Sequence, residues 1–412
     1  MTKARKDNKG RALRQGESQR ASDLMYYYTF TDPFGKRRYV YSKDLMKLRE
    51  KEKNLMKDQL DGLDVYAAGK ADLNFLFDRY ISTKSELRST TYSNYMYMYD
   101  HFVRELFGKK KVADVKYSDI LYFYEYLMKE CNLQVNTLES IHTVLHPSFQ
   151  LAVRDGIIRK NPTDGVMAQI KKKPGRTHTI RHALTLEQQR AFMRYISESP
   201  IFCRWEPLFT VLLGTGCRIG EVIGLRWEDI DMDKRMISIN HSVTYYPRKT
   251  DTYKCEYAVS LPKTAAGIRM IPMLDAVYEA FQEELDFHKE NGFCEVEIDG
   301  MSGFIFCNRF GNLQNPAAVN RAIKRIYEAY NAEEVLNAKK EKREPVIIPH
   351  FSCHHLRHTF CTRFCENETN VKVIQSVMGH ANIETTLDIY AEVSETKKQE
   401  SFENLSKNLH VF

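Results

Sequence analysis

Histidines, arginines and a cysteine, whose side chains can all do chemistry, are concentrated in HHLRHTFCTRF, from His354 to Phe364. On a helix, His354 and Arg357 would lie close to the same side because they are three residues apart. A guanidinium presents paired donors that match two phosphate oxygens, and an imidazole beside it adds another donor. The segment therefore suits a grip on a phosphate group, but an HxxR pattern alone does not establish one.

The same stretch allows two other interpretations. Zinc-ligand types lie on one stripe of the helix: His354, His358, Cys361 and Cys365. That stripe would run about 16 Å at roughly 1.5 Å per residue, so one tetrahedral ion reaches only neighbours in it. No HExxH or paired CxxC supplies the missing ligands. The opposite stripe is apolar and consists of Leu356, Phe360 and Phe364, which predicts a helix packed on one side and polar on the other.

Three further motifs carry single candidates. In GTGCRIGEVIGLRWEDID, Arg218 stands at a glycine-flanked helix start, where helix N–H groups favour an anion. LPKTAAGIRMIPM places Lys263 in a loop between strands, from which its amine could move onto a substrate. In MGHANIETTLDIYAEV, Gly379 ends a helix, His380 follows, and Tyr390 comes near the end of a short helix. Each residue also has a structural explanation. Arg218 could be a salt-bridge partner, Lys263 could lie in a solvated turn, and Tyr390 could be a core residue.

Length, charge and cysteine usage limit the class of protein. At about 100–200 residues per domain, 412 residues predict two to three domains. The net charge is +7, and its concentration near the start points to a polyanionic partner. Nine cysteines without a CxxC pair indicate reduced thiols. We find neither a signal peptide nor an apolar run of about 18 residues, so we expect a cytoplasmic protein without a membrane segment.

The N-terminal region, residues 1–65, predicts a small sheet with a basic arm and one helix. MYYYTF and RRYVY, separated by a turn at DPFGK, form a hairpin pattern, and Ser42 can cap a charged helix through LMKLREKEKNLMKD. A two-stranded ribbon fits the major groove of B-DNA. The alternative is a basic hairpin without sequence preference. The candidate DNA contacts are Arg11, Arg14, Lys36, Arg37 and Arg38.

A helical domain and a linker follow. Residues 66–170 show helical periodicity: TTYSNYMYMYDHFVREL repeats apolar residues at helix spacing, Ser118 starts another helix, and Gly156 ends a third. The repeated positions are Tyr92, Met96, Tyr99, Phe102, Val103 and Leu106. We interpret these aromatic stripes mainly as core. Residues 171–183, KKKPGRTHTIRHA, predict a basic linker that can lie along a phosphate backbone. Its candidate contacts are Lys171, Lys172 and Lys173.

Residues 184–412 hold all four motifs. Thr185 and Gln188 form a capping box for a helix, and helices then surround one β-rich interlude. MISINHS, YAVSLPK and IRMIPM supply short strands. The expected fold is therefore mixed α+β and mostly α. It has an N-terminal sheet-plus-helix module, a helical domain, and a mainly α-helical domain with a small antiparallel sheet.

Taken in order, the candidates resemble a known signature. The sequence Arg, Lys, HxxR, GH, Tyr matches the active site of the tyrosine recombinases, also called the phage integrase family. TGCRIGEVIGLRWEDID, PKTAAGIRMIP, HHLRHTFCTRF and MGHANIETTLDIYAEV resemble the family's motifs over nearly the whole C-terminal half. GESQR and YTFTDPFGKRRYVYS are similar to the arm region of integrases from Gram-positive conjugative transposons.

The resemblance implies a site-specific recombinase that integrates and excises a mobile element, a conjugative transposon or prophage. It would cut and rejoin DNA through a 3′-phosphotyrosyl intermediate. Arg218 and Arg357 would hold non-bridging phosphate oxygens, and Lys263 would protonate the leaving 5′ oxygen. His354 and His380 would donate to the phosphate or assist proton transfer. The nucleophile would be Tyr390.

The resemblance also implies partners and excludes cofactors. The helical and catalytic domains would clamp core-site DNA, the N-terminal module would read arm sites, and four protomers would assemble on two duplexes. An excisionase and a host DNA-bending protein are further candidate partners, in a bacterial cytoplasm where the chain associates with the nucleoid. No cofactor or metal is implied, and Glu221 and Asp231 are interpreted as structural partners.

Three alternatives stay open at this point. The C-terminal run SETKKQESFENLSKNLHVF could dock on a neighbouring protomer or fold back on its own domain. A type IB-like topoisomerase would share the chemistry, but it has no need of a separate arm-binding module. A catalytically silent DNA-binding regulator is disfavoured because every catalytic position is filled.

Overall fold

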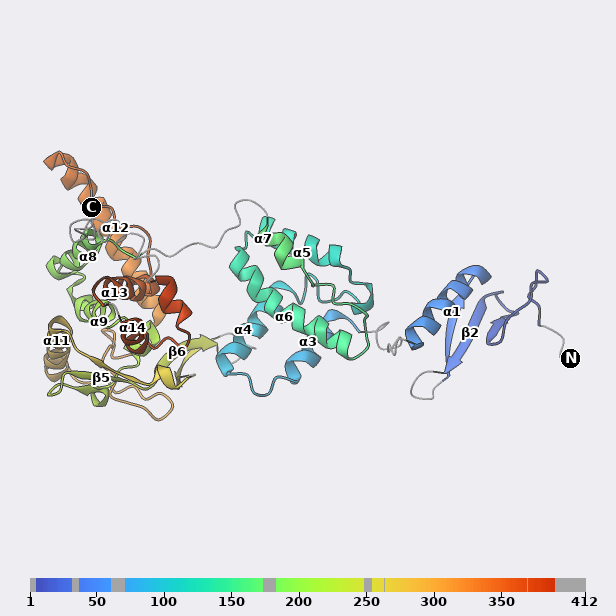
Figure 1. Cartoon of the computed structure of the whole chain (residues 1–412), viewed down its shortest axis with the longest axis horizontal. Helices are drawn as coiled ribbons and strands as arrows, with labels where there is room; N and C mark the ends of the chain where they lie inside the picture. The colour runs from blue at the N-terminus through green and yellow to red at the C-terminus, as the bar shows by residue number, and fades with distance from the viewer. Residues whose placement is uncertain are drawn as a thin grey trace, which may run out of the picture. The chain divides into compact units, whose positions relative to one another are not determined.

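The computed structural model describes residues 5–31, 37–60, 71–172, 183–247, 254–262, 264–368 and 370–389 (Figure 1). The chain divides into two compact units near residue 180. Within the described residues, no helix is both long and apolar enough to cross a membrane.

The first unit begins with a three-stranded antiparallel sheet in the order β1 (Glu17–Gln19), β2 (Tyr26–Thr31), β3 (Arg37–Ser42). The pairing of β2 with β3 confirms the predicted hairpin, whereas β1 was not predicted. Helix α1 (Leu45–Leu60) packs on the sheet through Leu45 and Leu48, which are buried with Tyr26. The packing follows from the period of two along a strand, which turns alternate side chains to one face.

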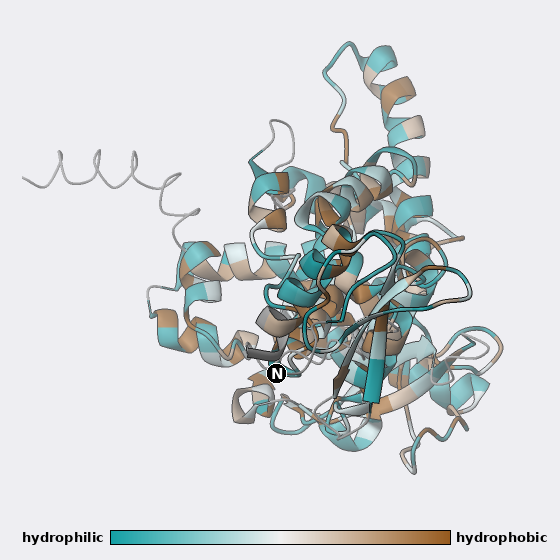
Figure 2. Ribbon diagram, turned by 90° about the vertical axis from the view of Figure 1, so that its right-hand side faces the viewer, coloured by the Kyte–Doolittle hydropathy of each residue, from teal (hydrophilic) through white to brown (hydrophobic). Residues whose placement is uncertain are grey.

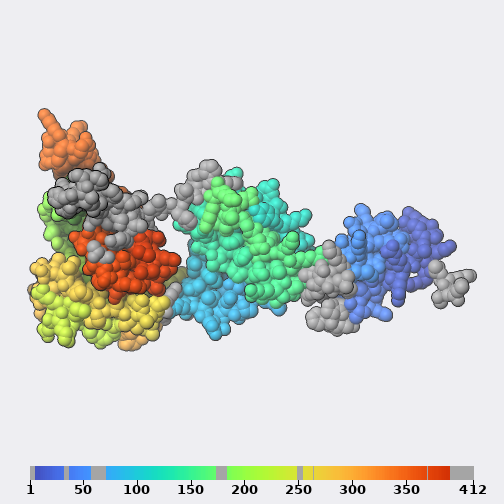
Figure 3. Space-filling model, viewed as in Figure 1, coloured from blue at the N-terminus to red at the C-terminus, as the bar shows by residue number. Residues whose placement is uncertain are grey.

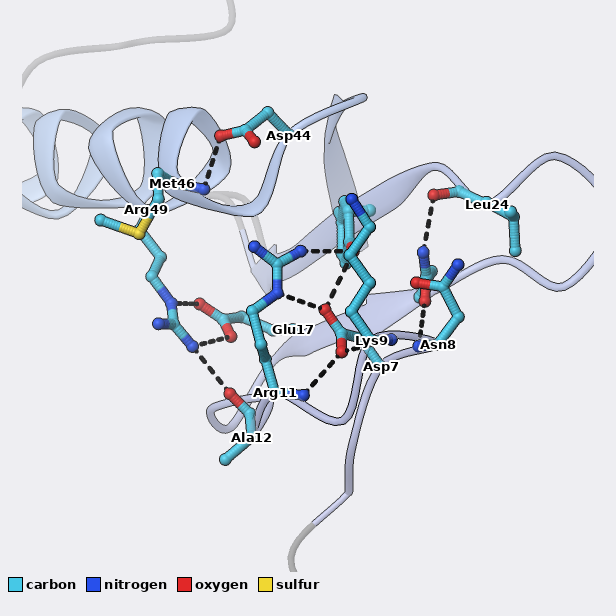
Figure 4. Close-up of polar contacts among 12 residues, drawn as sticks. Asp7, Asn8, Lys9, Arg11, Ala12, Glu17, Leu24, Asp44, Met46 and Arg49 are labelled. Atoms are coloured by element: carbon cyan, nitrogen blue, oxygen red, sulfur yellow. Dashed lines mark hydrogen bonds and ion pairs between the residues drawn. The ribbon is translucent and has the colours of Figure 1, made fainter.

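Polar contacts fix the start of this module (Figure 4). The carboxylate of Asp7 accepts hydrogen bonds from the backbone N–H and Nε of Arg11 and from the hydroxyl of Tyr26. The predicted cap of α1 by Ser42 is wrong. Asp44 Oδ1 accepts from the N–H groups of the first helical turn at 2.9 and 3.0 Å, because a carboxylate two residues further on reaches those donors directly.

The rest of the first unit is helical. Its elements are α3 (Leu73–Ser82), α4 (Ser89–Phe102), η1 (Val112–Asp114), α5 (Tyr117–Lys129), α6 (Val135–Arg154) and α7 (Val166–Lys171). A fully buried core holds these helices, with Phe77 stacked on Tyr99 at 3.7 Å between ring centroids. Gly156 follows α6 with φ +70°, which confirms the predicted helix end.

The aromatic pattern of this domain was only partly predicted. Tyr99 and Val103 are buried as expected, but Tyr92 and Leu106 are exposed. Helix α4 ends at Phe102, so Leu106 lies beyond the helix and does not continue its apolar face. On α5, Tyr122 is 76% exposed, so the interpretation of aromatic residues as core does not hold for that helix face.

The second unit contains helices around two small sheets. The helices are α8 (Leu186–Glu198), η2 (Cys203–Trp205), α9 (Glu206–Thr215), α10 (Ile219–Ile223), η3 (Trp227–Asp229), η4 (Ala265–Gly267), α11 (Asp275–Asn291), α12 (Pro316–Glu341), α13 (Cys353–Asn367) and α14 (Val371–Met378). The strands are β4 (Ile230–Asp231), β5 (Met236–Ile239), β6 (Ser242–Pro247), β7 (Cys255–Ser260) and β8 (Arg269–Pro272). Hydropathy varies around the helices as expected for elements that pack on one side (Figure 2).

The sheets confirm antiparallel pairing and correct one detail. β4, β5 and β8 form one sheet, and β6 pairs with β7 in another. MISINHS therefore contains the whole of β5 and the first residue of β6, with a break at Asn240 and His241. The capping box of Thr185 and Gln188 is present at the start of α8, as predicted.

Helix α13 is more buried than its sequence predicts. Leu356 faces the main core, and Cys361 and Cys365 pack with Ile374 and Met378 in a separate apolar cluster. α13 contacts α9, α12 and α14, so neighbours cover it on several sides. The expectation of one polar side was therefore wrong. The surface of these last helices, drawn in red, borders that of the strands, drawn in yellow, in agreement with the contact between α14 and β8 (Figure 3).

Candidate active site

The turn between α9 and α10 positions Arg218. Gly216 ends α9 with φ +62°, and Arg218 is the N-cap of α10. Gly220 lies against the backbone of β6, since a Cβ there would be only 2.7 Å from the carbonyl oxygen of Val243. Glycine at position 220 is therefore what permits this close approach of two backbone segments. α10 thus sits directly on β6, and Arg218 stands at its first turn.

Glu221 holds Arg218 in place from one turn further along. Its Oε2 accepts the backbone N–H of Arg218 at 2.8 Å, and its Oε1 accepts Nη1 of the same residue at 2.9 Å. Burial alone would raise the pKa of Glu221, but hydrogen bonds from Arg269 and Arg218 hold it below its usual value. The carboxylate therefore stays ionised. The side chain of Arg218 is still 44% exposed, which leaves its guanidinium accessible to a ligand.

Arg357 joins the end of α9 to the end of α14. Its Nη1 donates to the carbonyl of Gly216 and its Nη2 to that of Met378, both at 2.7 Å. Burial and the nearby Arg218 lower the pKa of Arg357 to about 10. The group is therefore still cationic at neutral pH. Two carbonyls leave further N–H donors of the guanidinium for a ligand, because the group has five.

His380 follows the C-cap of α14, Gly379, whose φ is +62°. The imidazole is buried, and its Nδ1 lies 2.9 Å from Oγ1 of Thr386. Burial, followed by the charges of Arg357, Arg218 and Arg269, lowers the pKa of His380 to about 4. His380 is consequently neutral at physiological pH.

Three of the six predicted catalytic residues thus share one charged cluster: Arg218, Arg357 and His380. His354 lies in the first turn of α13, one turn before Arg357, and is exposed. Lys263 and Tyr390 lie outside the described residues.

Arg269 was not singled out from the sequence, although its charge acts on both Arg357 and His380 in this cluster. Its side chain is only 4% exposed and forms an ion pair with Glu221 at 2.9 Å. A signal was present in GIRMIP. Arg269 alternates with Met270 and shares its face with Ile271, so a strand would turn the arginine inward with the isoleucine.

The zinc-ligand stripe of α13 is divided between an exposed His354 and two buried cysteines. Cys361 and Cys365 pack among apolar side chains. Among the residues that the structure describes, no group of three or more His, Cys, Asp or Glu side chains is arranged to hold a metal ion.

Comparison with known proteins decides the family. The pattern of the phage integrase family matches residues 182–397, and that of the DNA binding domain of Tn916 integrase matches residues 1–59. The transposase from transposon Tn916 of Enterococcus faecalis is 32% identical over 420 residues, which cover 99% of this chain and 98% of the relative. The chain belongs to the phage integrase family. It is a tyrosine recombinase, an enzyme that cuts and rejoins DNA at specific sites.

Solved structures agree with this assignment. The Tn1549 transposon integrase in complex with transposon right end DNA matches with a TM-score of 0.68 and 27% identity, over 82% of this chain and all of that one. A lambda integrase dimer bound to a core site shares the fold, with a TM-score of 0.52 and 17% identity over 92% of this chain and 95% of that one. These relatives favour a DNA-binding recombinase over a topoisomerase or a silent regulator.

The predicted DNA contacts of this tyrosine recombinase have varied surroundings. Arg11 is bound by Asp7 and Tyr26, whereas Arg14, Arg37 and Lys172 are exposed. Arg38 is partly buried, and Lys171 forms an ion pair with Glu139. Lys36 and Lys173 lie outside the described residues.

Proposed function

We propose that this recombinase integrates and excises a mobile element by attack of Tyr390 on a DNA phosphodiester. The cluster of Arg218, Arg357 and His380 is the observation that carries the proposal. Two guanidiniums close enough for Arg218 to lower the pKa of Arg357 suit an anionic phosphate, and their charge would stabilise the extra negative charge of the transition state. Electrostatic stabilisation of this kind is usually the largest contribution to such catalysis.

The chemical step balances without a cofactor. The phenolic oxygen of Tyr390 forms a bond to phosphorus, and the bond from phosphorus to the 5′ oxygen breaks. Lys263 supplies the proton that the leaving 5′ oxygen takes up, and His354 donates a hydrogen bond to the phosphate. Tyrosine titrates near 10, so the surrounding cations would help it lose its proton, which passes to the imidazole of His354 or His380. The 3′-phosphotyrosyl link retains the bond energy until a 5′ hydroxyl of a second duplex attacks it.

The N-terminal module supports a second DNA contact at arm sites. Tyr26, Tyr28 and Val40 pack toward α1, so the residues that alternate with them lie on the opposite face of the sheet. There Tyr39 and Tyr41 are 49% and 40% exposed. This open face also contains Tyr27 and Arg37, and we assign it to arm-site DNA. Arg38 belongs to the side of the sheet that α1 covers.

Assembly follows from the chemistry of exchange. Two duplexes require four protomers, and a lambda integrase tetramer has been solved on a Holliday junction. We propose a homotetramer on core DNA, tethered to distal arm sites by the N-terminal module in the bacterial cytoplasm. Two linked binding modules raise the effective concentration of the second contact. An excisionase and a host DNA-bending protein would then set the direction of the reaction.

A trapping experiment tests the cleavage chemistry. Nicked duplexes from the DNA that flanks the gene lose a short fragment on cleavage, which prevents religation. Wild-type protein in a chelator should form an adduct that survives denaturing electrophoresis, and Tyr390→Phe should bind the same duplex without forming one. An adduct from Tyr390→Phe, or none from wild type on any bound duplex, would refute the proposal.

A further inference from the structure

Arg269, the first residue of β8, contacts elements from three of the predicted active-site motifs. Its Nη2 donates to Glu221 Oε2 at 2.9 Å, and its Nη1 lies 3.3 Å from Oε1 of the same carboxylate. Nε donates to the carbonyl of Val377, near the end of α14, at 2.7 Å. Nη1 also lies 3.3 Å from the carbonyl of Gly267 in η4, which begins two residues after Lys263.

The guanidinium also lies directly against the residue before His380. A Cβ at Gly379 would be 2.9 Å from Nη1 of Arg269 and 3.0 Å from the carbonyl of Ala266. Gly379 has φ +62°, so both its conformation and its surroundings favour glycine. The backbone that leads into His380 is thus packed between Arg269 and η4.

Arg269 and Arg357 both connect the end of α14 to the region where α9 ends and α10 begins. Arg269 binds the carbonyl of Val377 and the side chain of Glu221, while Arg357 binds the carbonyls of Met378 and Gly216. Successive carbonyls at the C-terminus of α14 therefore each receive a guanidinium donor. Cations at this end of a helix also interact favourably with its dipole.

The two arginines are about equally buried, with 8% of Arg269 and 7% of Arg357 exposed. They differ in the nitrogens that the protein already uses: Arg269 donates through Nε, Nη1 and Nη2, whereas Arg357 donates to two carbonyls through Nη1 and Nη2. Arg269 therefore has less capacity left to bind a phosphate. Its contacts instead reach Glu221, which holds Arg218, and the turn that presents His380.

We infer that Arg269 is a positioning residue for DNA cleavage, which fixes the Arg218 turn, the η4 loop after Lys263 and the His380 turn in one geometry. The inference rests on the proposed function of those residues. A misplacement of about 1 Å far from the reacting atoms can slow catalysis on the order of 100-fold. Loss of Arg269 should therefore lower the rate of cleavage without weakening the binding of DNA.

The charge of Arg269 provides a second readout. His380 faces the cations of Arg357, Arg218 and Arg269 and the carboxylate of Glu221. Removal of one cation should raise the pKa of His380 from about 4 toward its usual range. Lysine at position 269 keeps the charge but cannot reproduce the three-way hydrogen bonding, so it separates the two effects.

The test compares Arg269→Gln and Arg269→Lys with wild type in full-length protein bound to the nicked duplex. Single-turnover adduct formation should be about 100-fold slower for Arg269→Gln, with DNA affinity within about threefold of wild type. Arg269→Lys should also be slower. NMR titration of the His380 imidazole should show a raised pKa in Arg269→Gln and an unchanged one in Arg269→Lys.

Arg204→Gln is the matched control. Arg204 donates to both carboxylate oxygens of buried Glu284 through its two Nη atoms, as Arg269 does to Glu221, but Glu284 is not part of the cluster of Arg218, Arg357 and His380. It should cleave at the wild-type rate. Thermal melting of each variant identifies any variant that fails to fold. If Arg269→Gln fails to fold, the cleavage rate of Arg269→Lys tests the positioning role.

The outcomes separate the inference from the proposed function. No adduct from wild type would overturn both. Wild-type cleavage rates in Arg269→Lys and in folded Arg269→Gln would overturn the positioning role alone. An unchanged pKa of His380 in folded Arg269→Gln, or equal slowing in Arg204→Gln, would also overturn it.

Discussion

Replacement of Glu221 by glutamine removes a carboxylate that connects Arg218 with Arg269. Glu221 is 7% exposed and accepts hydrogen bonds on both oxygens. Glutamine keeps the shape but offers only one acceptor oxygen. In either orientation of the amide, its NH₂ group would face N–H groups of Arg218 or Arg269 that now donate hydrogen bonds to the carboxylate.

The expected loss of stability follows from the buried pair. Breaking a buried ion pair by removal of one partner costs about 3–5 kcal/mol, because the other charge stays buried. The remaining amide oxygen of Gln should bring the cost to the lower end, about 3 kcal/mol. For a domain of about 150–250 residues, this lowers the melting temperature by roughly 6–12 °C. Cleavage should slow on the order of 100-fold, since Arg218 loses its anchor.

The assay pairs thermal unfolding with single-turnover adduct formation at a temperature where the variant is folded. Glu284→Gln is the control, since Glu284 is 1% exposed and is bound by both Nη atoms of Arg204. Its partner is 39% exposed, so solvent can replace part of the lost interaction. The control should lose less stability and cleave normally. A folded Glu221→Gln that cleaves at the wild-type rate would refute the reasoning.

Three further predictions concern other parts of the chain. Gly379→Ala should lose about 1–2 kcal/mol of unfolding free energy and cleave slowly, because its φ is +62° and a methyl would lie 2.9 Å from a guanidinium nitrogen. Gly292→Ala, at φ +94° with open space around it, should cleave normally in the same chemical denaturation and cleavage assays. Against the effect of burial, hydrogen bonds lower the pKa of Asp7 from 3.8 to about 2, so its stabilising contribution is present above pH 3.8 and is lost toward pH 2. Unfolding followed by circular dichroism should show that the stability of Asp7→Asn depends less on pH between 3.8 and about 2 than the stability of wild type. An equal pH dependence in the two proteins would contradict this role of Asp7. Tyr39→Ala combined with Tyr41→Ala should weaken binding to arm-site duplexes and leave cleavage of core duplexes unchanged. If gel-shift titrations show unchanged affinity for arm-site duplexes, the open sheet face is not the arm-site contact.

Motif residues were predictable where the local backbone determines the geometry. The glycines around Arg218 and Gly379 at the end of α14 indicate a turn and a helix end from sequence alone, and both are present. The capping box of Thr185 was predictable for the same reason, since it lies within one helical turn. The order of motifs identified the family because several weak signals agreed.

Long-range packing was harder to predict. Arg269 depends on partners such as Glu221 and Val377, which are 48 and 108 residues away in the chain. The burial of Cys361 and Cys365 likewise requires α14 to cover α13, and helical periodicity contains no information about a second neighbour. Local patterns identify which residues face inward, whereas the identity of their partners depends on the tertiary fold.

Mass spectrometry of the trapped adduct tests the central claim most directly. After nuclease digestion of the DNA and proteolysis, the peptide with an attached nucleotide is sequenced, and the linkage is assigned from the products of phosphodiesterase digestion. The account predicts a single modified residue, Tyr390, joined to a 3′ phosphate, in protein prepared and reacted in chelator. Attachment at another residue, or a 5′ linkage, would contradict it.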